Sequence, residues 1–593
     1  MDLQSRGTNA RMPVLAFDRE GERIFFMEAG GGGPGGGPNE PAKFITYLSS
    51  VKLDGDDSRR HIEGNFVTEI VPSPDGNWVF FKEQHKLYVA PFPKVGKTVR
   101  LSSTETGVPV RPVSAASGDW LAWGSDSKSV QWTAGENFYE QSLENVLRSL
   151  AKDEKAPAPQ KTVVGFDFET ARPRGLVALT NARVVTMRGD EVIERATVLV
   201  ENNRIKEVGA RITIPANAKR IDLAGKTVVP GLIDVHAHMS YDTLDIIPEK
   251  QWPYWANLAY GVTTTHDPSA ATQTVFAQSE MVKAGAMTGP RIFSTGFVLY
   301  GAENPEKAVV NSYDDARAHL ERLSAVGAFS VKSYNQLRRD NRQRIIRAAR
   351  DLGMMVVPEG GSTWGHNMTM ILDGHTGIEH AVPVAPLYKD ALTLFARSRT
   401  QYTPTLIVGY GGIWGENYWY QQSDVYADGK LLRFTPRANV EPRARRRMHV
   451  SSDDFYHFEL AKTVKDIVRA GGKAQLGAHG QLQGLGVHWE LWMLQQGGLT
   501  PLEALRAATL HGAQYLGLDG DLGSIEPGKL ADLVVFDKSP LEDIRNSTSI
   551  RYVMANGRLY SADNMDEVYP EQRPRPPFFW ERRLEGSLPS TEP

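Results

Sequence analysis

The sequence predicts an α/β protein built on a (β/α)8 barrel, with strand-rich segments before and after the barrel. Two observations favour this fold class. Between residues 230 and 518, short apolar strands alternate with helical segments, and the stretch is long enough for a barrel of about 250 residues. On both sides of it, short strands are separated by Gly and Asn, which is typical of small β-structures.

Length and composition limit the class of protein. At 593 residues the chain is too long for one core, and three or more domains are expected. A net charge of −3 gives no general attraction to nucleic acid. The absence of cysteine excludes disulfides, thiolate metal ligands and a Cys nucleophile. Neither a membrane-spanning run nor a signal peptide is visible, which leaves the localisation open.

The first 152 residues contain a weak repeat in which an Asp- and Gly-rich turn precedes an aromatic strand. The copies lie at residues 17–26, 73–81 and 117–123. Spacings of roughly 40–55 residues fit propeller blades, and Ser73-Pro74-Asp75-Gly76 looks like the TolB-type propeller repeat. A closed propeller needs about four blades or more, so we expect a partial β-propeller that is completed by another chain or shortened relative to its relatives. A small β-rich cap is the alternative.

Three further features are expected around this segment. The Gly- and Pro-rich residues 30–38 predict a mobile hairpin loop, and residues 138–152 have helical spacing. Residues 153–175 begin with a Pro-rich stretch and read as a linker.

Short strands are predicted on both sides of the barrel. They lie at residues 176–179, 183–187, 196–201 and 204–208, and at 532–536, 552–555 and 558–560. Asn556-Gly557 is a good two-residue hairpin turn between the last two.

The barrel strands are expected where apolar runs precede polar residues. They are residues 232–235, 262–265, 291–294, 329–331, 354–357, 377–379, 401–405 and 474–477. Thr500-Pro501-Leu502-Glu503 predicts a helix start with a capping box and Pro at the first helical position. Active sites on this fold lie at the C-terminal ends of the strands, so polar residues there are the candidates.

His236 and His238 follow the first barrel strand. Residues i and i+2 of a strand face the same side, so both imidazoles point the same way and could begin a divalent-metal site. A bare His-x-His is more often one core and one surface histidine, and the surrounding residues decide between these readings.

Two stretches of the sequence stand out, Val228-Val229-Pro230-Gly231-Leu232-Ile233-Asp234-Val235-His236-Ala237-His238 and Leu522-Gly523-Ser524-Ile525-Glu526-Pro527-Gly528-Lys529-Leu530-Ala531-Asp532-Leu533-Val534-Val535. Both resemble the amidohydrolase superfamily, in its imidazolonepropionase/prolidase-like branch. The resemblance covers about residues 175–560. It implies a composite β-sandwich from residues 176–229 and 519–562, a barrel over 230–518 and a C-terminal tail over 563–593. Relatives that join a propeller to such a barrel are usually exported.

The resemblance also implies a ligand set. Lys332 matches the lysine that is carboxylated to bridge two metals, and His380 matches a histidine ligand. Two positions depart from the pattern: Glu359 stands where the family usually has His, and His479 where it usually has Asp. One or two divalent metal ions, most plausibly zinc, are implied.

The two departures together keep the number of imidazoles and carboxylates unchanged. We therefore expect a swapped ligand set in which Glu359 and His479 both reach the metals. His479 is the first choice for the catalytic acid–base and Glu359 the alternative. The competing hypothesis is a barrel that has lost catalysis and kept the fold.

A long insertion at residues 408–447 is rich in aromatic residues. Tyr410, Trp414 and Tyr418 could form a substrate-binding wall for an apolar or peptide-like substrate. Packing against the propeller segment or another subunit is an equal alternative.

The expected activity is metal-dependent hydrolysis of an amide or cyclic amide C–N bond in a small-molecule or peptide-like substrate. A prolidase-like dipeptidase, a deaminase or lactonase, and a propeller-mediated binding protein with an inert barrel are the alternatives. A homo-oligomer or a companion propeller chain is expected, and no nucleic-acid partner.

Overall fold

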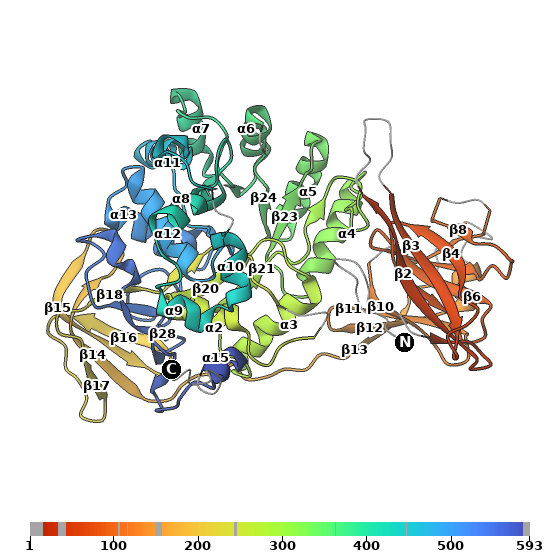
Figure 1. Ribbon diagram of the computed structural model, residues 1–593, viewed down its shortest axis with the longest axis horizontal. Coiled ribbons are helices and arrows are strands. Elements are labelled where there is room, and N and C mark those ends of the chain that lie inside the picture. The colour runs from red at the N-terminus through yellow and green to blue at the C-terminus, as the bar shows by residue number, and fades with distance from the viewer. Residues whose placement is uncertain are drawn as a thin grey trace, which may run out of the picture. The chain divides into compact units, whose positions relative to one another are not determined.

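The computed structural model describes residues 16–33, 43–104, 107–114, 117–148, 157–241, 246–361, 363–445 and 448–584 (Figure 1). The chain divides into two compact units. One contains residues 1–167, 242–246 and 298–354, and the other contains residues 168–241, 247–297 and 355–593. Neither unit is one continuous stretch, because the first takes in residues 298–354, which the sequence assigns to the barrel.

Three β-sheets make up most of the first unit. Their strand orders are β1-β2-β3-β4-β8, β5-β6-β7-β9 and β10-β11-β12-β13. The strands are Ala16–Phe17 (β1), Arg23–Gly33 (β2), Lys43–Lys52 (β3), Arg59–Asn65 (β4), Val67–Pro72 (β5), Trp78–Glu83 (β6), Lys86–Pro91 (β7), Val99–Leu101 (β8), Arg111–Ser114 (β9), Asp119–Trp123 (β10), Ser129–Ala134 (β11), Asn137–Ser142 (β12) and Gln160–Val163 (β13).

The second sheet is buried on both faces. Phe80 and Phe81 are neighbours on β6, so they point to opposite sides. Phe81 packs with Leu48 of the first sheet, and Phe80 packs with Trp132 of the third. Sheets stacked in this way are what blades of a propeller would give, while the propeller itself stays a prediction.

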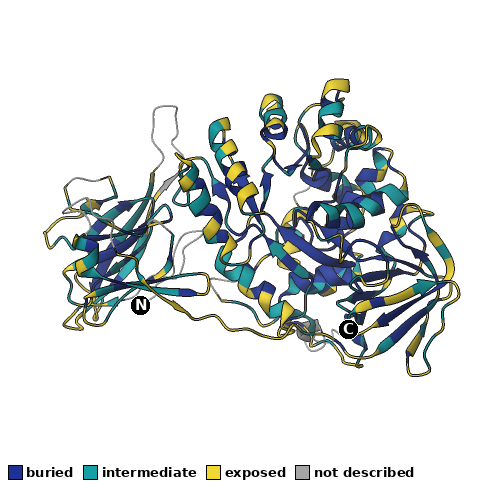
Figure 2. Cartoon of the chain, turned by 180° about the vertical axis from the view of Figure 1, so that it is seen from behind, coloured by how far each residue is buried: buried dark blue, intermediate teal, exposed yellow. Residues whose placement is uncertain are grey.

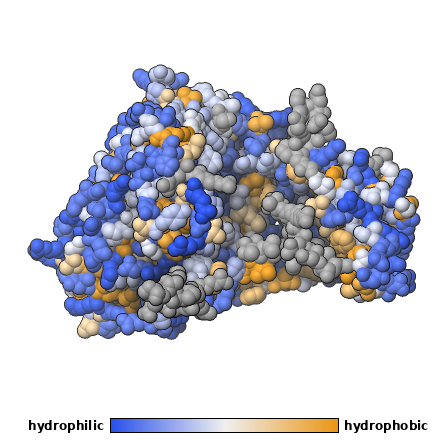
Figure 3. All heavy atoms as spheres, viewed as in Figure 1, coloured by the Kyte–Doolittle hydropathy of each residue, from blue (hydrophilic) through white to orange (hydrophobic). Residues whose placement is uncertain are grey.

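The outer faces of the first and third sheets carry polar networks. On the first sheet, the Glu28 carboxylate accepts hydrogen bonds from Ser49 (2.5 Å) and Arg60 (2.7 Å). On the third, the Glu140 carboxylate accepts from Ser129 (2.6 Å) and Gln131 (2.9 Å). Hydrophilic residues cover most of the visible face of the first sheet (Figure 3). The same two sheets also expose Phe17 of β1 (64%) and Trp120 of β10 (67%), and the companion propeller chain stays a prediction.

The helix expected over residues 138–152 is wrong in its first part. Residues 137–142 form β12, the described part of the helix is α1, Leu143–Arg148, and residues 149–152 lie outside the described residues. A tight turn at Gly135 returns the chain along β11, and the Tyr139 ring stacks on Trp132 with centroids 5.5 Å apart. Cross-strand pairing therefore overrides helical spacing here.

The expected linker and hairpin loop also differ from the structure. Residues 160–163 of the linker form β13, which pairs with β12. Residues 30–33 of the loop belong to β2, which pairs with β3. Residues 34–38 of that loop and 151–156 near the start of the linker lie outside the described residues.

The remainder of the first unit consists of two short parallel strands and two helices. The helix α4 begins with a capping box between Ser312 and Asp315. The elements are Leu299–Tyr300 (β22), Tyr313–Ser324 (α4), Ser330–Tyr334 (β23) and Arg339–Asp351 (α5). The predicted strand 329–331 is thus shorter than β23, which continues to Tyr334.

In the second unit, two distant parts of the chain form one nine-stranded sheet of order β16-β15-β14-β18-β27-β28-β29-β30, with β17 paired to β14. The join is antiparallel pairing of β18 with β27, for example Val228 with Val535. The strands are Leu176–Val185 (β14), Val192–Glu201 (β15), Arg204–Gly209 (β16), Lys219–Asp222 (β17), Thr227–Pro230 (β18), Leu533–Phe536 (β27), Ile550–Ala555 (β28), Arg558–Ser561 (β29) and Glu567–Tyr569 (β30). The strands of this sheet include both buried and exposed residues (Figure 2), and β18 and β27 are buried along their whole length.

Two details of this sheet correct the sequence prediction. The first two predicted strands are one strand, β14, with irregular pairing to β15. The expected tail contributes β30, which pairs with β29. At the predicted hairpin turn, Asn556 and Gly557 both have positive φ, 49° and 78°, as a two-residue turn of this kind requires.

Strands and helices alternate through the rest of the second unit. The strands β19-β20-β21 pair in parallel, as do β25 and β26. The strands are Leu232–Asp234 (β19), Val262–Asp267 (β20), Arg291–Ser294 (β21), Met355–Pro358 (β24), Gly377–Glu379 (β25) and Gln401–Thr403 (β26). The helices are Trp252–Ala259 (α2), Thr272–Lys283 (α3), Trp364–Asp373 (α6), Lys389–Ser398 (α7), Gly415–Gln422 (α8), Gly429–Phe434 (α9), Arg437–Arg445 (α10), His457–Arg469 (α11), Leu485–Gln496 (α12), Pro501–Arg506 (α13), Gly512–Tyr515 (α14) and Phe579–Leu584 (α15).

The capping box at Thr500 and Glu503 is confirmed, with Pro501 in the first turn. No helix among the described residues is long and apolar enough to cross a membrane.

The eighth predicted barrel strand, residues 474–477, is not a regular strand. It makes only an isolated bridge between Ala474 and Tyr402 of β26. On its other side, Val235 N–H donates to Leu476 O (3.0 Å) and His479 N–H to His236 O (2.8 Å). The segment therefore lies between β26 and the chain that follows β19, as a closing strand would. The fold is mixed α/β, and the complete eight-stranded barrel stays a prediction.

Candidate metal centre

His236 and His238 follow strand β19 and lie close together. His236 is fully buried, and 27% of the His238 side chain is exposed. Their Nε2 atoms are 3.1 Å apart, so both rings point at the same point. A Cβ at Gly477 would lie 2.6 Å from the His236 Cβ, so only glycine lets the neighbouring segment approach this ring.

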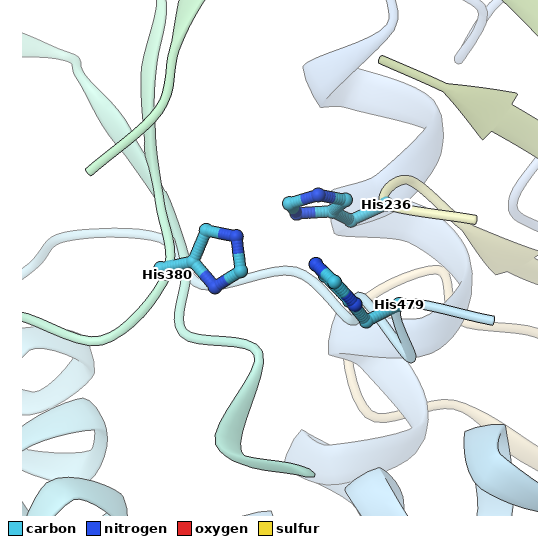
Figure 4. A group of neighbouring side chains, drawn as sticks. All are labelled: His236, His380 and His479. Carbon is cyan, nitrogen blue, oxygen red and sulfur yellow. The ribbon is translucent and has the colours of Figure 1, made fainter. Parts of the chain in front are cut away.

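His380 and His479 complete a group of four imidazoles. The His236 ring centroid is 4.8 Å from that of His380 and 5.0 Å from that of His479, and His238 is 4.6 Å from His479. One ring nitrogen from each of His236, His380 and His479 lies within 4.8 Å of the others. Figure 4 shows these three rings turned toward one another from three separate segments.

Both added histidines have a left-handed backbone. His380 directly follows β25 with φ 68°, and His479 has φ 58°. Non-glycine residues adopt this conformation rarely, and it concentrates at functional sites where surrounding structure holds it. The backbone here is bent to aim two side chains inward.

Glu359, which follows β24, joins the group through His380. Its Oε1 lies 2.9 Å from His380 Nε2, and 15% of its side chain is exposed. The two predicted departures from the family pattern, Glu359 and His479, therefore lie on the same ring of side chains. This geometry is what a swapped ligand set requires, although ligation itself stays a prediction.

Lys332 is on β23 in the first compact unit. Lys332 is 1% exposed, and its Nζ lies 5.6 Å from the centroid of the Tyr334 ring. Its expected carboxylation and metal bridging stay predictions.

Two acidic residues that the sequence reasoning did not weigh lie behind the strand-one histidines. Glu379 Oε2 is 3.3 Å from His236 Nδ1, and both side chains are fully buried. Asp267 Oδ1 is 3.1 Å from His238 Nδ1. With these acidic partners at Nδ1, the Nε2 atoms of both rings face the centre. Their positions could have identified them from the sequence, because Asp267 is the last residue of β20 and Glu379 is the last residue of β25.

A third carboxyl, Asp234, ties the chain around the site together. Its Oδ1 accepts from the backbone N–H groups of His236 and Ala478, both at 3.1 Å. Burial raises the pKa of Asp234 to about 6. This residue fixes the segment after β19 against the one that carries His479.

The structure places the three aromatic residues of the predicted substrate-binding wall in different surroundings. Tyr410 lies against His380 with ring centroids 5.2 Å apart, and Trp414 is 47% exposed. Tyr418 instead packs within an aromatic cluster that includes Phe455 and His457. Tyr410 therefore lies beside the histidine centre, where its contact with a substrate stays a prediction, whereas the placement of Tyr418 favours packing.

Other histidines hydrogen-bond to the backbone away from the centre. His266 Nδ1 lies 3.1 Å from Val235 O, His375 Nδ1 2.9 Å from Met370 O, and His511 Nδ1 3.0 Å from Ala474 O. His488 contacts Tyr260 O (3.0 Å) and the Ser547 hydroxyl (2.9 Å). These contacts fit a structural role for each of the four histidines.

Comparison with known proteins identifies a family that part of this chain resembles. The model of the amidohydrolase family matches residues 471–560. Imidazolonepropionase of Vibrio cholerae is 45% identical over 67 residues, which is 11% of this chain and 17% of that protein. Imidazolonepropionase of Acinetobacter baumannii is 24% identical over 408 residues, covering 60% of this chain and 92% of that protein. The first of these matches thus spans well under a fifth of the relative's length.

Solved structures agree in fold. A crystal structure of a Xaa-Pro dipeptidase with bound methionine in the active site has a TM-score of 0.51 at 22% identity, covering 65% of this chain and all of that one. The structure of A. niger ochratoxinase has a TM-score of 0.51 at 18% identity, covering 66% and 96% of the two chains. The sequence matches and the fold support an enzyme similar to the amidohydrolase superfamily, whose family model matches residues 471–560 of this chain.

Proposed function

We propose that this protein is a metal-dependent hydrolase of amide or cyclic amide C–N bonds. One observation carries the proposal: four imidazoles converge at the ends of the strands, with a carboxylate beside them and acidic residues behind two of them. The relatives named imidazolonepropionase support the bond class.

The residues fit a divalent metal ion. His380 is 3% exposed, and while its Nε2 lies 2.9 Å from Glu359 Oε1, its Nδ1 makes no hydrogen bond to a described residue. A buried polar atom without a partner needs another ligand, and a ring nitrogen is a good metal donor. The donor set of His236, His238, His380, His479 and Glu359 contains nitrogen and oxygen only. Such a set suits zinc, and Mn²⁺, Fe²⁺ or Co²⁺ are compatible with it.

When bound, a divalent ion supplies Lewis-acid activation of water and of the scissile carbonyl. The chain's own residues then supply proton transfer. His479 is placed among the other rings, and an imidazole can both accept and donate a proton near neutral pH. Glu359 is the alternative acid–base, and its contact with His380 would then hold it at the edge of the centre.

A prolidase-like dipeptidase is the second candidate. Tyr410 lies beside His380, where it could contact a peptide-like substrate, and the Xaa-Pro dipeptidase shares the fold. Screening small peptides, amides and lactones separates this activity from deamination and lactone hydrolysis.

The first test is metal content, measured by plasma mass spectrometry on protein purified without chelator. We expect about one to two metal ions per chain in the wild type, and clearly less in Glu359→Ala and in His479→Ala. His61→Ala and Glu542→Ala are controls that change residues outside the centre and should keep the wild-type content. Metal near zero in the wild type would favour the binding-protein reading with an inert barrel.

A further inference from the structure

A second concave region lies in the same unit as the histidines, at the opposite ends of the strands. It is a cavity of about 870 Å³. Thr263, near the start of β20, and Arg291, the first residue of β21, line it. Asp267, which contacts His238, is the last residue of β20. From Thr263 to Asp267 a strand rises roughly 13 Å, so the cavity is a different place from the metal centre.

The lining carries an excess of positive charge. Arg291 is paired with the buried Asp532 (Nε to Oδ2, 2.9 Å), but its Nη1 donates to no described residue. Glu567, outside the cavity, accepts from both Arg558 and Arg573 at 2.7 Å, so one carboxylate serves two guanidinium groups.

Three further cations at the cavity have no acidic partner. Arg172, Arg174 and Lys283 form no ion pair with any acidic residue that the structure describes. Besides Asp532, the acidic lining residue is Glu571. Cationic walls around a concave site focus a positive potential into it.

The wall that carries two of these arginines is held in place. Ala171 N–H donates to Lys283 O (2.8 Å), and its carbonyl accepts from Asn556 Nδ2 (2.8 Å). This pins the chain beside Arg172 and Arg174 to the end of α3 and to the turn after β28. The remaining walls include apolar side chains, among them Val282, Met287 and Phe293.

We propose that this cavity binds a small organic anion with an apolar body, at a site separate from the metal centre. The volume lies in the range of small-molecule pockets, the guanidinium and ammonium groups suit a carboxylate or phosphate, and the apolar walls suit the rest of the molecule. The inference goes beyond the proposed hydrolysis and does not depend on it.

The test uses the full chain and 8-anilinonaphthalene-1-sulfonate, a fluorescent anion with an apolar body. Its affinity is measured by titration for the wild type and for Arg172→Ala/Lys283→Ala. We expect roughly tenfold weaker binding in this variant, because charge-assisted hydrogen bonds to the anion are lost. The matched control is Arg220→Ala/Lys389→Ala, which removes one exposed Arg and one exposed Lys outside the cavity and should bind as the wild type does.

A second measurement needs no variant. Benzoate should displace the probe from the wild type, whereas the neutral benzyl alcohol should do so poorly, and inorganic phosphate shows whether a free phosphate group competes as a carboxylate does. The proposal is overturned if the wild type binds no probe, if both double variants bind alike, or if benzoate and benzyl alcohol displace it equally.

Discussion

His236 and His238 lie two residues apart just after the end of β19, and each has its own acidic partner. Glu379 comes from β25 and Asp267 from β20, so three strands fix the direction of two rings. Asp267 is itself held by Met239 N–H (3.2 Å), Tyr241 O–H (2.8 Å) and Ser269 N–H (3.0 Å). A carboxylate so firmly placed can hold the His238 ring ready for a metal.

We expect Asp267→Asn to lower metal affinity about 10- to 100-fold, the usual effect of losing such a partner. The measurement is competition with a chelator of known affinity. Tyr241→Phe is the matched control, because it removes one donor to Asp267 and leaves the carboxylate on His238. Equal affinities in wild type and Asp267→Asn would show that this carboxylate does not position the ring.

At the scale of single residues, the sequence predicts side-chain directions that follow from strand geometry. It does not predict side-chain contacts that depend on how the chain folds. The two-residue period of a strand led to the prediction that His236 and His238 point the same way, and their rings do converge although β19 ends before them, at Asp234. The contacts of Glu379 and Asp267 depend on which strands become neighbours and on ring rotation, which no local pattern records.

Among the elements, the turn after β26 lies next to the histidine centre. Thr405 has φ 48°, and its hydroxyl lies 3.4 Å from His236 Nδ1. The next two backbone N–H groups, of Leu406 and Ile407, donate to the two oxygens of Glu490 at 2.8 and 2.9 Å. Glu490 is fully buried on α12, so one side chain anchors the whole turn.

Replacing Glu490 with Ala should destabilise the protein by roughly 2–4 kcal/mol, because two buried N–H groups lose their acceptors. Denaturant unfolding measures this loss. Glu490→Gln keeps one acceptor oxygen and should lose less. If Glu490→Ala unfolded like the wild type, the turn would be held by its other contacts.

Elements were predictable where a local signal agrees with the fold. Residues 291–294 and 377–379 are strands as predicted, and the Thr500 capping box starts its helix. Residues 138–142 have helical spacing but lie in β12, because hairpin pairing with β11 decides their state. Residues 474–477 lie where a closing strand would lie, but they lack its continuous ladder of backbone hydrogen bonds. Sequence alone does not distinguish such a segment from a regular strand.

Across the whole molecule, several buried histidines are held neutral. Burial lowers the pKa of His319 and His488 to about 3, and that of His457 and His511 to about 4. The unfolded chain binds protons at these groups below about pH 6.5, while the folded chain does not. Their contribution to stability is therefore complete above that pH and is lost as pH falls toward 3–4.

Unfolding of the metal-free protein at pH 7.5 and pH 5 tests this. His488→Gln removes one titrating group, so its stability should fall less between the two pH values than that of the wild type, by on the order of 2 kcal/mol. Asp234 and Glu490, whose pKa values burial raises to about 6 and about 8, act with the opposite sign and are common to both proteins. Parallel pH profiles would contradict the prediction.

The join between β18 and β27 has a consequence for how the protein is made. The two strands pair, but roughly 300 residues separate them, so a ribosome needs roughly 15–60 s to deliver the second after the first. Throughout that time the apolar β18 has an open edge that could pair with another chain. The edge of β18 therefore stays unpaired until nearly all of the intervening segment has been synthesised. We expect aggregation through this edge to be most serious late in synthesis.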